Sequence, residues 1–205
     1  MAENKILILF AHPKFENSRV NKELIASAMK VKNVKVHDLY ETYPDYWINV
    51  EKEQELLLQH DIVVFQHPLY WYSVPPLMKQ WMDLVLAFNW AYGPQGDKLK
   101  GKILLSAVSS GGDQSAYSKE GKHGHTLEEF LLPVKQTAKL CKMKYLPVFA
   151  SYASHVVSDE KLLDNSGLYA IMLNHLQKTN LETLEVEGMK TMNEWALQQL
   201  KISEQ

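Results

Sequence analysis

The loop from His12 to Asn21 carries side chains that could bind an anion, and it follows the apolar run Ile6–Phe10. Ser18 and the backbone N–H groups of the residues that follow it lie where a helix should begin. The start of a helix favours negative charge. Ser18 could equally be a plain N-cap without a ligand. The loop also holds the only arginine of the chain, Arg19. The chain has neither a G-x-G-x-x-G motif nor a P-loop, so the usual dinucleotide and nucleotide sites lack support.

A second loop, His67–Pro76, places Tyr70, Trp71 and Tyr72 next to one another between prolines. Three adjacent aromatic side chains in a loop could stack on a flat ring while backbone amides bond to the edge of that ring. A hydrophobic plug or a contact between subunits would use the same residues. We favour the ring-binding interpretation.

A third loop begins with Ser109-Ser110-Gly111-Gly112 and continues to Tyr117 and His123. Paired glycines allow the backbone to approach a ligand closely. Tyr117 and His123, six residues apart, could donate two hydrogen bonds to negative charge that develops during a reaction. The alternative is that these side chains are merely solvated.

The composition is that of an ordinary globular protein, with 46% hydrophobic and 22% charged residues and a formal net charge of −2. This charge does not favour binding to nucleic acid or to an acidic membrane surface. The N-terminal apolar run is too short for a signal peptide, and no segment approaches the length of a membrane span, so we expect a cytoplasmic protein. His123, His125 and His155 lack the spacing of a zinc site, and we expect no metal.

Short apolar runs alternate with helical patterns along the chain, which is typical of βαβ units with a parallel sheet. In such sheets, ligands bind beyond the carboxyl ends of the strands, where the three loops above begin. We predict one domain, residues 1–180, with a helical extension over residues 181–205 that could be a docking or dimer-edge element. The predicted strands are Ile6–Phe10, Val34–Asp38, Asp61–His67, Lys102–Ser109 and Tyr145–Ala150, and the predicted helices cover residues 18–30, 50–59, 77–88, 127–140, 159–178 and 190–200.

Five motifs in this order resemble those of the NAD(P)H:quinone oxidoreductase family, over about Lys5 to Lys178. The similarity is greatest to short bacterial members, including the ancillary oxidoreductases of glutathione-gated potassium-efflux systems. The motifs are His12-Pro with Ser18 and Asn21, His67-Pro-Leu-Tyr-Trp-Tyr-Ser-Val-Pro-Pro-Leu77, Lys79-x-Trp81-x-Asp83, Trp90-Ala-Tyr92-Gly93, and Ser109-Ser-Gly-Gly with Tyr117-Ser and Gly121-x-His123-Gly124.

The resemblance implies a flavodoxin-like fold with five parallel strands in the order 2-1-3-4-5. It further implies a bound flavin, FMN or alternatively FAD, NAD(P)H as the hydride donor, a quinone-like acceptor and a ping-pong cycle. Tyr117 and His123 match the catalytic pair of the family. Tyr92, supplied by the partner subunit of a homodimer, and Trp71 match substrate contacts. The implied flavin-binding residues are His12, Ser18, Arg19, Val20, Asn21, Pro68, Leu69, Tyr70, Trp71, Tyr72, Ser109, Ser110, Gly111 and Gly112.

Two positions depart from the family pattern. Arg19 stands where the family often has a small residue, and Pro94 stands where the animal enzymes have a second aromatic residue after Tyr92.

Two rival functions also remain. A one-electron flavodoxin carrier would leave the loop with Tyr117 and His123 without a task and would have a strongly acidic surface. A regulatory subunit that docks on a membrane transporter has no residue signature that would separate it from an independent enzyme.

Overall fold

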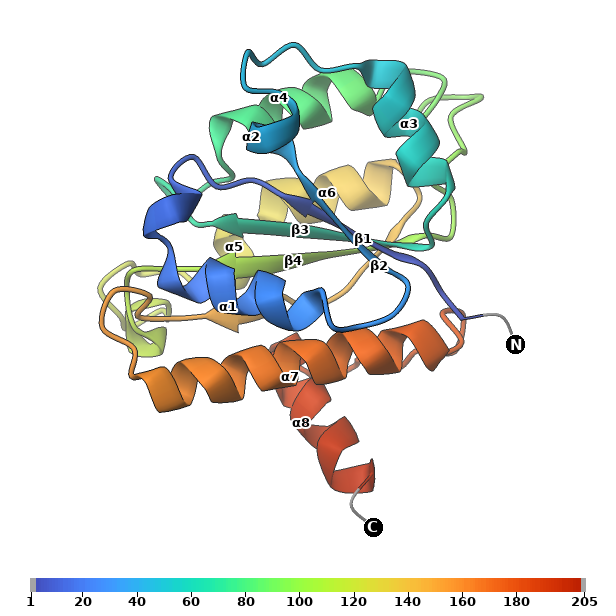
Figure 1. Cartoon of the computed structure of the whole chain (residues 1–205). Coiled ribbons are helices and arrows are strands. Elements are labelled where there is room, and N and C mark those ends of the chain that lie inside the picture. The colour runs from blue at the N-terminus through green and yellow to red at the C-terminus, as the bar shows by residue number, and fades with distance from the viewer. Residues whose placement is uncertain (1–2, 204–205) are drawn as a thin grey trace.

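The apolar runs of the sequence form a parallel sheet in the computed structural model, which describes residues 3–203 (Figure 1). The strands lie in the order β2-β1-β3-β4-β5, with β6 also paired to β4, so the predicted fold class is confirmed. Every residue of β1, β3 and β4 is buried, as expected for central strands covered on both faces. The strands are β1 Ile6–Phe10, β2 Val34–Asp38, β3 Ile62–Pro68, β4 Ile103–Ser109, β5 Lys144–Tyr145 and β6 Phe149–Ser151.

The predicted fifth strand, Tyr145–Ala150, is wrong as a single element. The chain forms two short strands, β5 and β6, and both pair with β4. Pro147 lies between them. Because proline has no backbone N–H to donate, the ladder with β4 cannot run unbroken through this position.

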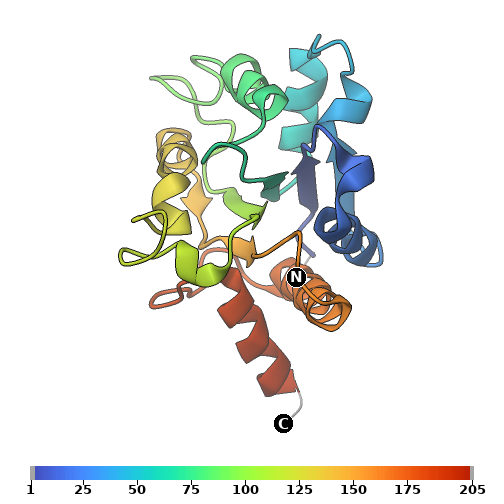
Figure 2. The ribbon, with the colours of Figure 1, turned by 90° about the vertical axis from the view of Figure 1, so that its left-hand side faces the viewer.

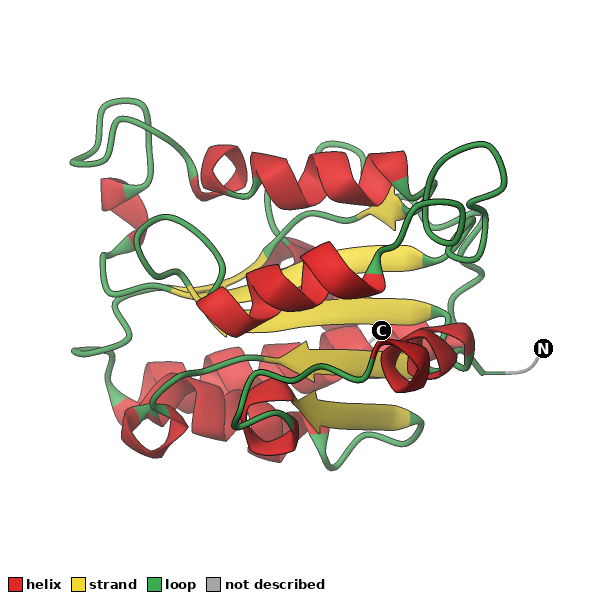
Figure 3. Cartoon of the chain, turned by 90° about the horizontal axis from the view of Figure 1, so that it is seen from above, coloured by secondary structure: helices red, strands yellow, loops and turns green. Residues whose placement is uncertain are grey.

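Helices cover both faces of the sheet, as Figures 1 and 3 show. Strand residues alternate between two cores, because successive side chains point to opposite faces. Ile6, Ile8 and Phe10 pack with α1 and α7, whereas Leu7 and Leu9 pack with α3, α4 and α6. These helices are α1 Arg19–Ala28, α3 Val50–Leu58, α4 Pro76–Val85, α6 Leu132–Leu140 and α7 Asp159–Lys178.

Two short helices differ from the prediction. The helix predicted over residues 127–140 is divided at Leu131 into α5 Leu127–Phe130 and α6, where Pro133 stands near the start of the second helix. The sequence did not predict α2 Leu39–Thr42, which is capped by Asp38 through bonds from the N–H groups of Tyr40 and Glu41. Single helical turns of the 3-10 type lie at Phe15–Asn17 and Gln114–Ala116.

The C-terminal helix α8, Met192–Ser203, lies against α7 and the edge of the sheet. The Met192 N–H donates to the Val148 carbonyl at 2.9 Å, and Trp195 is buried in the same core as α1 and α7. The tail is therefore packed onto the domain that precedes it. Residues 1–2 and 204–205, which the domain prediction includes, lie outside the described residues. Within residues 3–203, no helix has the length and apolar character needed to cross a membrane.

Candidate functional site

The loops that follow β1, β3, β4 and β6 meet at one edge of the sheet, and Figure 2 looks onto this edge. They enclose a cleft of about 230 Å³. Predicted cofactor residues that line the cleft are His12, Ser18, Arg19, Pro68, Leu69, Tyr70, Ser109 and Gly111. Residues that line the cleft without having been predicted are Lys14, Asn17, Ser154 and His155. Ser154 and His155 lie in the loop that follows β6. Their position after a predicted strand was the sequence signal that could have identified them.

One end of the cleft is the start of α1. Ser18 caps the helix, and its Oγ accepts a hydrogen bond from the Asn21 N–H at 3.2 Å. The first N–H groups of the helix have no intrahelical partner and lie at the positive end of the helix dipole. Lys14 adds a positive charge, and none of the residues that line the cleft is acidic. This end of the cleft is suited to an anion.

Arg19 turns toward α7. Its guanidinium forms an ion pair with Asp159 at 2.6 Å and donates to the Val157 carbonyl at 3.2 Å. The residue that departs from the family pattern therefore joins two helices. Direct contact of Arg19 with a ligand stays a prediction.

Asn21 lies fully buried beneath the cleft and does not line it. Its side-chain amide donates to Ser109 Oγ at 2.9 Å and to Ser18 Oγ at 3.1 Å, and its Oδ1 accepts from Gln66 at 3.3 Å. Tyr169 on α7 donates to Gln66 at 3.0 Å. This network fixes the start of α1 relative to β3, β4 and α7.

His12 is buried, and the lost hydration of its charged form lowers the pKa of the imidazole. Nδ1 accepts a hydrogen bond from the Lys14 N–H at 3.1 Å, which leaves the hydrogen of the neutral ring on Nε2. The ring stands edge-on to Tyr70, with 5.9 Å between centroids. His12 therefore joins the anion end of the cleft to the aromatic loop.

The aromatic loop forms a tight turn. Tyr70 and Ser73 exchange backbone hydrogen bonds of 3.1 and 3.0 Å, and the two residues between them have φ values of 50° at Trp71 and 63° at Tyr72. Left-handed backbone at both central residues is a feature of turns that usually carry Asn-Gly, so two aromatic residues here hold strain. Trp71 is 93% exposed, and Trp71 and Tyr72 do not line the cleft.

Tyr117 and His123 are brought together beside the glycine loop, with ring centroids 4.7 Å apart. A β-carbon placed on Gly112 would lie 3.1 Å from the Tyr117 ring and 3.5 Å from His123 Nε2. The absence of a side chain at this position therefore allows the Tyr117 ring to pack close to the loop backbone. Tyr72 extends the cluster, since its ring centroid lies 5.5 Å from that of His123.

The loop that carries this pair is tied down at its far end. Thr126 and Glu129 form a capping box at the start of α5, and Lys119 forms an ion pair with Glu129. Hydrogen bonds from Lys119 and Thr126 lower the pKa of the Glu129 carboxyl to about 2. Glu129 is therefore ionised at neutral pH and ties Lys119, within the loop, to Thr126 at its far end.

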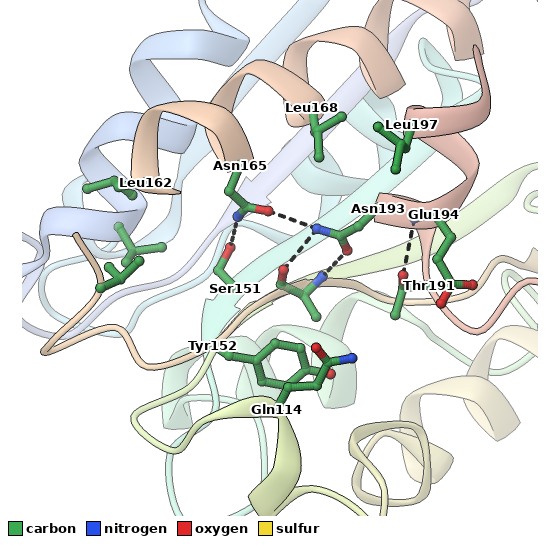
Figure 4. Close-up of a pocket in the computed structure, with 13 residues that line it drawn as sticks. Gln114, Ser151, Tyr152, Leu162, Asn165, Leu168, Thr191, Asn193, Glu194 and Leu197 are labelled. Atoms are coloured by element: carbon green, nitrogen blue, oxygen red, sulfur yellow. Dashed lines mark hydrogen bonds between the residues drawn. The ribbon is translucent and has the colours of Figure 1, made fainter. Parts of the chain in front are cut away.

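Other predicted positions do not line the cleft. Tyr92 is half-buried and packs edge-on against Phe88 at 5.7 Å between centroids. Val20 lines a separate cavity of about 360 Å³, which Figure 4 shows, and Tyr117 lines a third of about 570 Å³. Ser110 and Gly112 adjoin the cleft without lining it. In the part of the chain that the structure describes, no three His, Cys, Asp or Glu side chains gather as metal ligands would.

Comparison with known proteins gives consistent matches. The model of a protein family that is described as having a flavodoxin-like fold matches residues 4–170 of this chain. The chain is 44% identical to YdeQ of Bacillus subtilis, named an uncharacterized NAD(P)H oxidoreductase, over 89% of this chain and 90% of that protein. It is 39% identical to KefG of Enterobacter, an ancillary protein of a glutathione-regulated potassium-efflux system, over 80% of this chain and 90% of that protein.

Two solved structures are also similar. General stress protein 14 of Treponema denticola, in complex with FMN, superposes with a TM-score of 0.80 at 38% identity, over 84% of this chain and 99% of that one. A protein named NADPH-quinone reductase from P. pentosaceus superposes with a TM-score of 0.75 at 34% identity, over 81% of this chain and 95% of that one.

Proposed function

The chain belongs to the family of flavodoxin-like fold, and on this premise we propose that it is a flavin-dependent NAD(P)H oxidoreductase that passes hydride to quinone-like acceptors. The family predicted from the motifs is confirmed by these relatives. The observation that carries the proposal is the meeting of three features at one sheet edge. These are the anion-suited start of α1, the aromatic turn, and the Tyr117–His123 pair beside Gly112.

FMN fits the residues of the cleft. The first N–H groups of α1, Ser18 and Lys14 suit its phosphate, and Pro68, Leu69 and Tyr70 present apolar surface to a ring. Gly111 and Gly112 expose backbone that a ring edge can approach closely. The relative from Treponema denticola supports FMN, since it is in complex with this flavin. FAD is the alternative that the experiment below distinguishes.

When bound, a flavin would supply the chemistry for hydride transfer between NAD(P)H and the acceptor. The Tyr117 hydroxyl and the His123 imidazole would donate hydrogen bonds to the edge of the ring where negative charge accumulates. Ser18 and the start of α1, fixed in place by Asn21 beneath them, would hold the phosphate end. Trp71, fully exposed to solvent, would bound the face at which NAD(P)H and the acceptor bind in turn, which gives a ping-pong cycle.

A homodimer would complete this site. Tyr92 does not line the cleft of its own chain, which is compatible with a contact between Tyr92 and the acceptor in a second copy. Phe88 beside it is 61% exposed and Leu84 is 43% exposed, which leaves apolar surface for that copy. Light scattering should give the mass of two chains, and full turnover by a monomer would contradict this arrangement.

An ancillary role on a potassium-efflux transporter is a second candidate, favoured by the similarity to KefG. In that role the chain would act at the cytoplasmic face of a membrane. Co-purification with the transporter would support it. A one-electron carrier receives less support, because the net charge of −2 gives no strongly acidic surface for partner proteins.

The flavin assignment is tested by titration. The purified chain should be yellow, and the chromophore released by heat should be identified as FMN or FAD. The apo protein should bind FMN at micromolar concentration and more tightly than riboflavin, because charge-assisted bonds to a phosphate contribute about 1.5–3 kcal/mol. Equal affinities for FMN and riboflavin would show that the start of α1 is not a phosphate site. No binding of either flavin would overturn the proposed function.

A further inference from the structure

The glycine loop is held in place by the segment that follows β6. The Ser110 N–H donates to the Ser151 carbonyl at 2.9 Å, and the Ser110 carbonyl accepts from the Ser154 N–H at 2.9 Å. The Gly112 carbonyl accepts from the Ala153 N–H at 2.8 Å. The position of the Gly111 and Gly112 backbone therefore follows the position of residues 151–154.

That segment is in turn held by side chains from the two C-terminal helices. Asn165 on α7 donates to Ser151 Oγ at 2.6 Å, and Asn193 on α8 donates to Asn165 Oδ1 at 2.8 Å (Figure 4). Asn193 also pairs with both backbone groups of Ala150, accepting from its N–H at 2.8 Å and donating to its carbonyl at 3.0 Å. We call Asn193, Asn165 and Ser151 the Asn–Asn–Ser network.

The Asn–Asn–Ser network anchors the outer side of β6. Among the described residues, β6 pairs only with β4, so no further strand lies beyond it. The cavity of about 360 Å³ lies on this side and is lined by all three residues of the Asn–Asn–Ser network. Ser151 is only 5% exposed, so removal of its partner leaves a buried hydroxyl without its hydrogen bond. Hydrogen bonds therefore add to the core packing of Phe149 and Ala150 in fixing this strand end.

We propose that Asn193 is a positioning residue for the flavin, acting through Asn165 and Ser151 on the glycine loop. This inference rests on the proposed function. Asn193 lies beyond residue 170, where the match to the family ends, so the tail adds a constraint to the common fold. The same segment positions Tyr152, whose ring lies 5.9 Å from that of Tyr117. The tail therefore reaches both the glycine loop and one member of the proposed catalytic pair.

The expected consequence is a change in redox preference. Backbone donors at the glycine loop would bind the reduced flavin, with its greater negative charge, more strongly than the oxidised flavin. A loop that is free to move loses this preference, while the phosphate end, anchored at α1, keeps its affinity. The reduced flavin should therefore bind less tightly relative to the oxidised flavin.

The test compares Asn193→Ala and Ser151→Ala with Gln198→Ala, which changes an exposed residue of the same helix. Asn193→Ala should reduce the preference for reduced over oxidised flavin by about tenfold. This change lowers the midpoint potential of the two-electron couple by about 30 mV. Ser151→Ala should shift the potential in the same direction by a smaller amount. Gln198→Ala should retain the wild-type potential, and the dissociation constant of oxidised FMN should change by less than about threefold throughout.

Hydrogen exchange on the flavin-free protein gives a second readout. The N–H groups of Ser110, Ala153 and Ser154 should exchange about tenfold faster in Asn193→Ala, as expected for a local opening made easier by about 1.4 kcal/mol. Should Asn193→Ala fail to fold, Ser151→Ala alone decides the question. Wild-type potential and wild-type exchange in these variants would overturn the inference. A wild-type chain that binds no flavin would overturn the proposed function, while the exchange measurement would still show whether the tail positions the loop.

Discussion

The two ends of the candidate site are built differently. One is the start of α1 in the cleft, and the other is the cluster of Tyr117, His123 and Tyr72, which does not line that cleft. At the α1 end, side chains are joined by buried hydrogen bonds, and Asn21 alone contacts Ser18, Gln66 and Ser109. At the other end, Tyr117, His123 and Tyr72 meet through their rings. In the part of the chain that the structure describes, the Tyr117 hydroxyl and the His123 ring form no side-chain hydrogen bond. The α1 end is thus organised before any ligand arrives, whereas the polar atoms of the other end are available to one.

The backbone shows the same contrast. The start of α1 is a regular capped helix, whereas the turn with Trp71 and Tyr72 has left-handed backbone at two aromatic residues. Backbone strain of this kind clusters at functional sites. We infer that the α1 end selects and holds the ligand, and that the other end acts on it.

The largest expected effect is on rate and comes from the catalytic pair. His123→Ala, and less severely Tyr117→Phe, should slow flavin reduction by NAD(P)H by up to about 10²–10³-fold, because a positioned donor acts on charge that exists only as hydride moves. Flavin affinity and stability should hardly change, since neither side chain supports the fold by hydrogen bonds. Stopped-flow reduction beside a flavin titration measures both quantities. Unchanged reduction rates in both variants would remove the catalytic role of this loop.

The opposite pattern is expected at the α1 end. Asn21→Ala should lower the free energy of unfolding by about 3 kcal/mol even without flavin, because the Gln66 amide nitrogen and the Ser109 hydroxyl each lose a buried hydrogen bond to Asn21. Urea unfolding of the apo protein measures this change. Asn17→Ala, an exposed position that lines the same cleft, is the control and should change stability by less than about 0.5 kcal/mol. Similar stability in the two variants would contradict a preorganised α1 end.

A smaller effect of the other sign is expected at the aromatic turn. Trp71→Asn should stabilise the apo protein by about 1 kcal/mol, because asparagine tolerates left-handed backbone and the exposed indole loses little packing. The same change should weaken flavin binding. Trp47→Asn is the matched control, since Trp47 is 82% exposed without left-handed backbone. Thermal unfolding of both variants distinguishes strain from a general cost of exposed tryptophan.

The smallest effect is expected from the ion pair between Arg19 and Asp159. Their side chains are 47% and 89% exposed, so Asp159→Asn should change the free energy of unfolding by less than about 1 kcal/mol. It should nevertheless tighten FMN relative to riboflavin a few-fold, because Arg19 is released toward the cleft. Paired titrations with the two flavins check this. A constant ratio of the two affinities would show that Arg19 serves only to join α1 to α7.

The sequence alone determined the frame of this protein. Uninterrupted apolar runs predict buried parallel strands, and strands such as Ile6–Phe10 lie where predicted because that pattern depends only on local composition. Pro147 could also have predicted the division between β5 and β6, but the surrounding apolar run favoured a single strand. The three strand-end loops could likewise be expected to meet, because parallel strands bring their carboxyl ends to one edge.

Only the tertiary structure decided which side chains support the site and which face it. Asn21 bonds to Ser109, 88 residues away, and Arg19 bonds to Asp159, 140 residues away. Asn193 joins the tail to Ala150, and no motif marks it. Such contacts depend on how whole helices pack on the sheet, and this packing follows from buried area summed over many residues. A motif therefore predicts the loop that forms a site, whereas the packing of distant helices determines how firmly that loop is held.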